Sequence, residues 1–177
     1  MGLLSKNEID EICAEIEVQW EYHLMTRAVF YSKFPEKDYY ESPTFYQERG
    51  FSFKVEIPIK SDNFDRASRG IAVWLNQNYI IRLFGILDSK RIIKYGIEQK
   101  SEIIELIKIL RNNVGAHSSG RRVGKRKSDL LKATLLIIRL FDKKIELKDL
   151  DHFKLSVDSV LEPMKIKTID YIKELEK

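Results

Sequence analysis

The chain has 177 residues and a formal net charge of +4. Hydrophobic residues make up 44% of it and charged residues 33%, a composition that indicates a folded chain and excludes intrinsic disorder. At roughly 150 residues per domain, the length predicts a single domain over residues 1–177. No apolar run approaches the ~20 residues that a membrane crossing needs, and no signal-like segment opens the sequence. We therefore expect neither a secreted nor an integral membrane protein.

Cysteine and histidine usage points away from disulfides and metal sites. Cys13 is the single cysteine, so no internal disulfide can form, and we expect it to pack as a small buried residue. The three histidines lie far apart in the sequence and offer no compact zinc spacing. We expect a cytoplasmic protein with no metal and no cofactor.

A long helix is predicted at the start of the chain. Ser5 and Glu8 have the spacing of a capping box, and Pro35 predicts that the helix ends just before it. His23 and Arg27 share a face of this helix, but no third group is placed to orient the histidine, so we expect a partly exposed surface there. Apolar residues recur at helical spacing on one face: Ile9, Ile12, Cys13, Ile16, Trp20 and Leu24.

Residues 35–61 form an irregular insertion after this helix. Apolar and polar residues alternate from Phe51 to Ile59, which is the period of a half-buried strand. Pro58 would confine such a strand to an edge or to the end of a ladder, and the only partner that we identify is Lys144–Leu150. The aromatic residues of the insertion are expected to pack against helices: Tyr39, Tyr40, Phe45 and Tyr46.

A second helix is predicted from Asp62, which can cap it, to about Leu87. The polar run Asn76–Asn78 is expected to be its solvated side. Its apolar positions are Phe64, Ala67, Ile71, Trp74, Leu75, Ile81 and Phe84. A third helix opens at Ser101 and has a clear apolar stripe: Ile103, Leu106, Ile107, Leu110 and Val114.

A fourth helix is predicted from about Ser128 to Phe141, and because it is apolar nearly all round we expect it to be the most buried element. The tail, residues 151–177, breaks at Pro163 and resumes as a closing helix. The sequence therefore predicts an all-α bundle of four to five helices, with a long and partly extended insertion after the first.

The functional motif is concentrated in Leu110–Lys127, where the third helix ends. Asn112 follows Arg111 directly, and five residues separate Arg111 from His117. Histidine exchanges protons near neutral pH, arginine presents a planar cation that fits two phosphate oxygens, and an asparagine amide can donate to a phosphate. A dense basic run comes next: Arg121, Arg122, Lys125, Arg126 and Lys127.

These residue types suit RNA cleavage without a metal, in which the ribose 2′-hydroxyl loses a proton and the leaving 5′-oxygen gains one. A continuous helix would place Arg111 and His117 ~120° apart in azimuth, so they would not face one ligand. Gly115 is well suited to end the helix and let the chain turn back. The motif therefore requires a turn near Gly115, a second copy of the motif across a dimer axis, or both.

The pattern Arg111-Asn112…His117, at the junction of two helices, resembles the signature of the HEPN superfamily (higher eukaryotes and prokaryotes nucleotide-binding). The resemblance covers residues 62–141, and it explains neither the insertion nor the tail. It implies a helical homodimer whose two motifs line one cleft, and a metal-independent endoribonuclease that leaves a 2′,3′-cyclic phosphate. It further implies that Arg111 stabilises the scissile phosphate, His117 transfers protons and Asn112 supports them. Many members are toxins or defence effectors held by an antitoxin protein.

Two alternatives stay open for this segment. Arg111 would also neutralise the carbonyl end of its helix, with Asn112, Asn113 and Gly115 as ordinary cap residues and His117 in a loop. A non-catalytic module would use the same basic corner to hold RNA, a nucleotide or a protein partner. Viewed alone, the basic run is equally typical of a solvated loop.

Overall fold

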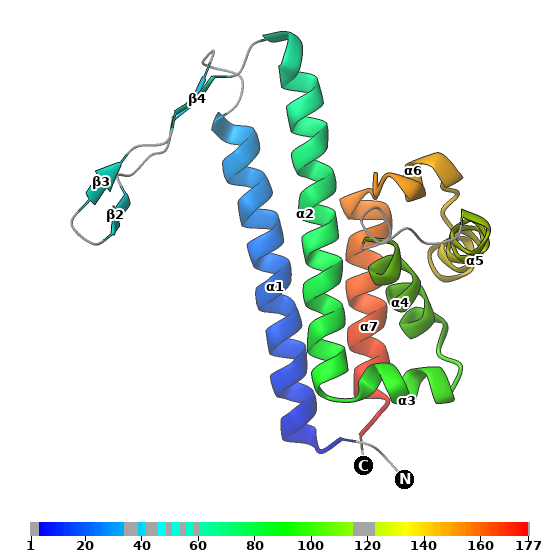
Figure 1. The fold of residues 1–177 in the computed structure, drawn as a ribbon. Coiled ribbons are helices and arrows are strands. Elements are labelled where there is room, and N and C mark those ends of the chain that lie inside the picture. The colour runs from blue at the N-terminus through cyan, green and yellow to red at the C-terminus, as the bar shows by residue number, and fades with distance from the viewer. Residues whose placement is uncertain are drawn as a thin grey trace.

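The computed structural model describes residues 4–33, 39–41, 46–48, 51–53, 56–58, 61–114 and 123–176, with side chains for 4–29, 69–114 and 127–176. The predicted all-α fold is confirmed (Figure 1). The helices of the described part are α1 (Lys6–Lys33), α2 (Ser61–Ser89), α3 (Ile92–Glu98), α4 (Glu102–Val114), α5 (Val123–Phe141), α6 (Leu147–Asp151), the π-helical turn η2 (Val157–Leu161) and α7 (Glu162–Lys173). The two short helices α3 and α6 were not among the four to five predicted.

Helices α1 and α2 are long and antiparallel, and α7 lies beside them (Figure 1). Helix α4 packs against α2, α3, α5 and α7, whereas α1 packs against α2 and α7. Helix α5 packs against α4, and it is seen nearly end-on in the view that shows α1 and α2 lengthwise, so its axis is steeply inclined to theirs (Figure 1). The two ends of the described chain meet, because the Leu4 amide donates to the Leu175 carbonyl at 3.1 Å.

The predicted capping box opens α1. The Ser5 amide donates to Glu8 Oε2 at 2.8 Å, and the Glu8 amide donates back to Ser5 Oγ at 3.4 Å. The buried stripe differs from the prediction at two places, because Leu24 is exposed with His23 buried instead, and Cys13, expected to be buried, is only partly buried. The stripe therefore continues from Trp20 to His23 and the partly buried Arg27 at helical spacing.

The most central helix is α4 and not α5. Seven α4 residues are buried: Ile103, Ile104, Leu106, Ile107, Ile109, Leu110 and Asn113. Helix α5 buries Leu130, Ala133, Leu136 and Ile137, but exposes Leu131, Leu135 and Ile138. Our prediction that α5 is the most buried element is therefore wrong. The apolar residues of α5 lie on two sides of the helix, and α4 packs against only one of these two sides.

Helix α2 turns a different face to the core from the predicted one. Trp74 is 58% exposed and Ile81 is 46% exposed, although both were expected in the apolar stripe. Asn76, expected on the solvated side, is only 2% exposed. Both corrections have one cause, because the buried face of α2 is rotated around the helix axis relative to Trp74 and Ile81. The buried apolar residues of this face are Leu75, Tyr79, Ile80, Leu83, Ile86 and Leu87.

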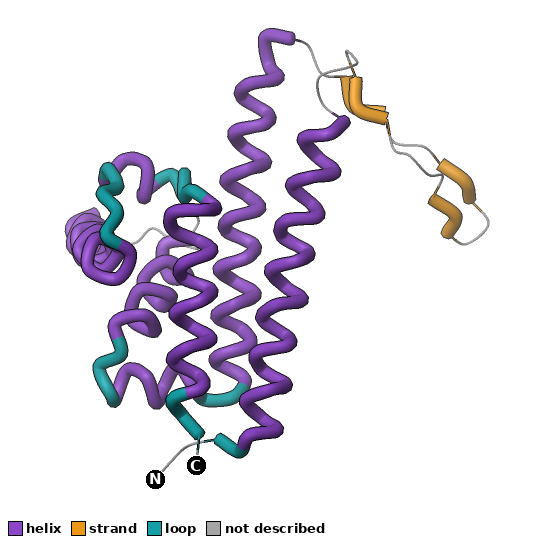
Figure 2. The backbone as a smooth tube through the Cα atoms, turned by 180° about the vertical axis from the view of Figure 1, so that it is seen from behind, coloured by secondary structure: helices purple, strands orange, loops and turns teal. Residues whose placement is uncertain are grey.

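The insertion contains four short strands: β1 (Tyr39–Glu41), β2 (Tyr46–Glu48), β3 (Phe51–Phe53) and β4 (Glu56–Pro58). Strand β1 pairs antiparallel with β4, and β2 pairs antiparallel with β3. The segment predicted as one strand at 51–59 thus contains two short strands, β3 and β4, whose partners lie in the aromatic part of the insertion, and Pro58 lies at the end of its ladder opposite Tyr39. The strands project beyond the ends of α1 and α2 and do not pack along the bundle (Figure 2).

The C-terminal part corrects two further predictions. Residues 147–151 form α6, so the proposed strand at Lys144–Leu150 is wrong. Pro163 lies in the first turn of α7, where a proline is tolerated because that amide lacks an intrahelical acceptor. The predicted closing helix is confirmed, and its Lys165 forms an ion pair with Glu17 of α1 at 2.7 Å.

Gly96 and Gly85 offer a matched pair of stability tests. A Cβ on Gly96 would lie 2.6 Å from Cγ1 of Ile104, a fully buried β-branched residue that has no room to turn away. A Cβ on Gly85 would meet none of the described atoms within 4 Å. Gly96→Ala is therefore expected to lower the free energy of unfolding by about 1–3 kcal/mol, and Gly85→Ala to raise it by about 0.5–1 kcal/mol. Urea denaturation measures both, and shifts of the same sign would contradict this packing.

Candidate active site at the end of helix α4

Arg111 and Asn112 lie in the last turn of α4. The Arg111 guanidinium is exposed, its Nη1 donates to Asn112 Oδ1 at 3.2 Å, and it stacks on the Phe84 ring of α2 at 5.0 Å from the centroid. A cation is favourable here because the last carbonyls of a helix carry partial negative charge. Among the described residues Arg111 has no carboxylate partner. It is thus held in place by a neutral amide and an aromatic ring, with its charge left for an anion.

Asn113 has a different role from Asn112. It is 1% exposed, and its Nδ2 donates to the Ile109 carbonyl at 2.8 Å within the same helix. Its Oδ1 has no donor within the described part of the chain. Asn113 therefore faces the core, whereas Asn112 lies at its boundary beside Arg111.

The rest of the motif lies partly outside the described residues. This applies to His117, Gly115, Arg121 and Arg122, so the structure describes two of the three predicted catalytic residues. Of the predicted RNA-binding residues, Lys127 is exposed, and Lys125 and Arg126 are described only as helical backbone. The geometry between Arg111 and His117 stays a prediction.

The basic run lies in part on a helix and not in a loop. Helix α5 begins at Val123, five residues before the predicted start at Ser128, so Lys125, Arg126 and Lys127 belong to its first turns. This first turn contains no acidic residue. Cations are unfavourable at a helix N-terminus, whose amides attract anions. The start of α5 therefore combines lysine and arginine residues with amides that have no acceptor within the helix itself.

Comparison with protein-family models, with curated proteins and with solved structures found no match to this chain. In the part of the chain that the structure describes, no helix is both long enough and apolar enough to span a bilayer. Nor do His, Cys, Asp and Glu side chains gather there in a group that could hold a metal ion.

A second polar cluster, centred on His23, lies inside the bundle. Arg27 Nε donates to His23 Nε2 at 3.2 Å, and Arg27 Nη2 donates to Asn76 Oδ1 at 3.0 Å. Asn76 Nδ2 donates in turn to the carbonyls of Phe153 and Leu155, both at 3.0 Å. The cluster therefore ties α1 to α2 and to the segment that precedes η2.

Our prediction of a partly exposed surface at His23 is wrong, because its side chain is only 5% exposed. Its ring packs against the rings of Trp20, at 5.5 Å, and Tyr79, at 5.2 Å, which also lie 5.3 Å from each other. Burial also raises the pKa of Tyr79. A histidine enclosed in this way has no path to a substrate, so the cluster is structural. The sequence signal that we missed is the helical spacing of Trp20, His23 and Arg27.

Acid is expected to destabilise the protein through His23. Burial, and then the Arg27 cation, lower the pKa of His23 from 6.5 to about 4. Between these two pKa values the unfolded chain binds a proton at His23 that the folded chain does not. The contribution of His23 to stability is therefore fully present above the unfolded pKa and is lost as the pH falls toward 4. Lowering the pH from about 7.5 to about 4.5 should remove about 2–3 kcal/mol through this residue.

The measurement is urea denaturation at both pH values for the wild type and for His23→Gln, which does not titrate. The variant is expected to lose less stability than the wild type over this interval. Equal losses in the two proteins would show that His23 is not the group responsible.

Proposed function

We propose that this protein is a metal-independent endoribonuclease of the HEPN type. The observation that carries the proposal is Arg111, an exposed cation with no carboxylate partner among the described residues, fixed at the end of α4 by Asn112 and Phe84. The sequence places His117 six residues further on, within reach of the same region if the chain turns. An arginine fixed in this way suits a phosphate, because its planar fork pairs with two phosphate oxygens.

Each residue of the motif has a role in the proposed reaction. His117 takes the proton of the 2′-hydroxyl or returns one to the 5′-oxygen, and its partner in the second subunit is available for the other transfer. The 2′-oxygen forms a bond to phosphorus as the bond to the 5′-oxygen breaks, which leaves a 2′,3′-cyclic phosphate and a 5′-hydroxyl. Arg111 stabilises the added negative charge of the transition state. Asn112 holds the Arg111 guanidinium, in keeping with their 3.2 Å hydrogen bond.

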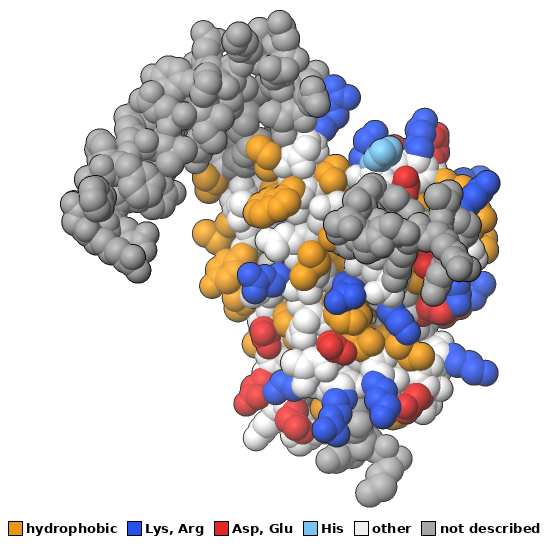
Figure 3. Space-filling model, in the orientation of Figure 1, with side chains coloured by type: hydrophobic (Ala, Val, Ile, Leu, Met, Phe, Trp, Pro, Cys, Tyr) orange, Lys and Arg blue, Asp and Glu red, His pale blue; other side chains and the backbone are white. Residues whose placement is uncertain are grey.

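The proposed enzyme is a symmetric homodimer with the two motifs in one cleft. Trp74 and Ile81 are exposed on α2, and Phe84, one turn after Ile81, carries the Arg111 guanidinium on its ring. In the view of Figure 3, hydrophobic side chains gather over α1 and α2. Exposed apolar surface of this kind is typical of an interaction site. A dimer formed there would bring the two copies of Arg111 toward one axis.

The basic run supplies the proposed RNA contact. Arg121, Arg122, Lys125, Arg126 and Lys127 follow the motif directly in the sequence. The start of α5 supports this assignment, because its cations and the partial positive charge of a helix N-terminus both favour a bound phosphate backbone. By the same resemblance we propose a toxin or defence effector in the cytoplasm, held by an antitoxin protein.

A non-catalytic module that binds RNA, a nucleotide or a protein partner is the alternative. It is favoured by the place of Arg111 in the last turn of α4, where a cation neutralises the helix end without any reaction. Incubating the purified protein with single-stranded RNA in EDTA separates the two functions. Cleavage with 2′,3′-cyclic phosphate ends supports the enzyme, whereas RNA that is bound and left intact supports the module.

A further inference from the structure

A cavity of about 290 Å³ opens where α3, α4 and α5 meet. It is lined by Ile97, Lys100, Ser101, Glu105, Lys108 and Lys132. This volume is at the lower end of small-ligand sites, so it suits a single phosphate or a small phosphorylated group. No residue of the Arg111-Asn112…His117 motif belongs to its lining.

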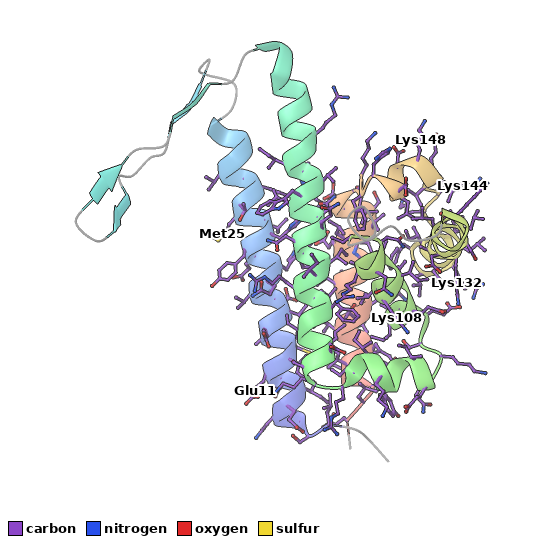
Figure 4. The ribbon with its side chains drawn as sticks, in the orientation of Figure 1. Glu11, Met25, Lys108, Lys132, Lys144 and Lys148 are labelled. Atoms are coloured by element: carbon purple, nitrogen blue, oxygen red, sulfur yellow. The ribbon has the colours of Figure 1, made fainter. Side chains whose placement is uncertain are left out.

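The cavity lining has an excess of positive charge. Three lysines face one carboxylate, that of Glu105, and Lys132 forms an ion pair with it. Lys100 and Lys108 have no acidic partner among the described residues. Figure 4 shows Lys108 on α4 and Lys132 on α5 on the same side of the molecule. Cations gathered in one concave surface concentrate positive potential, and an anion relieves their mutual repulsion.

The backbone holds Lys100 at the rim of this cavity. Its φ of 57° is in the left-handed region, which is uncommon for a residue other than glycine. Its amide donates to the Ile97 carbonyl at 3.1 Å, and the following Ser101 amide donates to the Gly96 carbonyl at 2.7 Å. These bonds fix the connection from α3 to α4, so the Lys100 backbone is ordered before any ligand binds.

The cavity also adjoins the proposed active site along α4. Lys108 and Arg111 are three residues apart, which places them ~4.5 Å apart along the helix axis and ~60° apart around it. A chain of phosphates that passes Arg111 on this face would reach Lys108 next. The positive surface of α4 is therefore continuous from the motif to the cavity.

We propose that this cavity binds a phosphate group, and that its occupant is a backbone phosphate of the RNA a few nucleotides from the scissile bond. The choice of RNA rests on the proposed function, whereas the choice of a phosphate rests on the cavity alone. A free phosphorylated small molecule shares this chemistry and is the other source to be distinguished.

The first arm of the test measures RNA. Anisotropy of labelled single-stranded RNA is followed in a His117→Ala background, so that no substrate is consumed. Adding Lys100→Gln and Lys108→Gln is expected to weaken binding roughly tenfold and to lower the salt slope by about one. The matched control removes two exposed lysines from helices that do not line the cavity, Lys6→Gln and Lys167→Gln. Lys100→Arg with Lys108→Arg keeps both charges and should keep the affinity.

The second arm adds inorganic phosphate to the ¹⁵N-labelled, otherwise wild-type protein and follows the amides of Ser101 and Glu105. Shifts that disappear in the variant with Lys100→Gln and Lys108→Gln support a phosphate cavity. If these shifts occur but RNA affinity falls equally in this variant and in the Lys6→Gln, Lys167→Gln control, the RNA assignment is overturned and a small phosphorylated ligand is the occupant. No shift with phosphate overturns the cavity itself. If the wild type fails to cleave RNA while the shifts persist, the proposed function fails and the phosphate cavity stands.

Discussion

Replacing His117 with alanine is expected to slow RNA cleavage by roughly 10²–10⁴-fold, the usual effect of losing a general acid or base. Arg111→Ala should slow it by roughly 10²–10³-fold, because in the proposed mechanism it removes the charge that stabilises the transition state. Both effects should appear mainly in kcat, since neither group is needed to hold distant parts of the RNA. Cleavage of labelled single-stranded RNA in EDTA measures these rates.

Two further variants sharpen this test. His152→Ala removes an exposed histidine at the end of α6 and should leave the rate unchanged. Arg111→Lys keeps the charge but loses the planar fork and the stacking on Phe84, so an intermediate rate is expected. If His117→Ala and Arg111→Ala both cleave like the wild type, the motif is not the active site and the assignment is wrong.

Asn76→Ala is expected to lower the free energy of unfolding by about 2–4 kcal/mol. It removes the donor to the carbonyls of Phe153 and Leu155, and it removes the acceptor of Arg27. Buried carbonyls without a donor are costly because they have also lost their hydration. Urea denaturation at neutral pH measures the loss.

Asn78→Ala is the matched control, since Asn78 lies on the same helix, is partly exposed and makes none of these bonds. We expect it to change stability by less than about 0.5 kcal/mol. Asn76→Asp keeps an acceptor for Arg27 but no donor for the two carbonyls, so it should be at least as unstable as Asn76→Ala. Equal stability of the Asn76 and Asn78 variants would show that the buried amide contributes nothing.

Much of the fold was predictable because its signals are local. The capping box of Ser5 and Glu8, the apolar repeat of α4 and the proline before the insertion each act within a few residues of the chain. The same local signals place Arg111 in the last turn of α4, where the structure has it. Extended backbone at 51–53 and 56–58 was also predictable from the alternating pattern, but its division into two strands and their partners were not, because pairing depends on which segments meet.

The sequence by itself determined the all-α class, the approximate bounds of α1, α2 and α4, and the place of Arg111 and Asn112 in the last turn of α4, whereas the stacking of Arg111 on Phe84 came only from the packing of α2 on α4. Only the tertiary structure decided which polar residues are buried. Asn76 and Asn78 look alike in the sequence, yet one of them ties α1 to the segment before η2. The cavity at Lys100, Lys108 and Lys132 likewise forms only when α5 crosses α4. The physical reason is that periodicity shows that a helix has two faces, whereas the packing of neighbouring helices selects the face that loses its water.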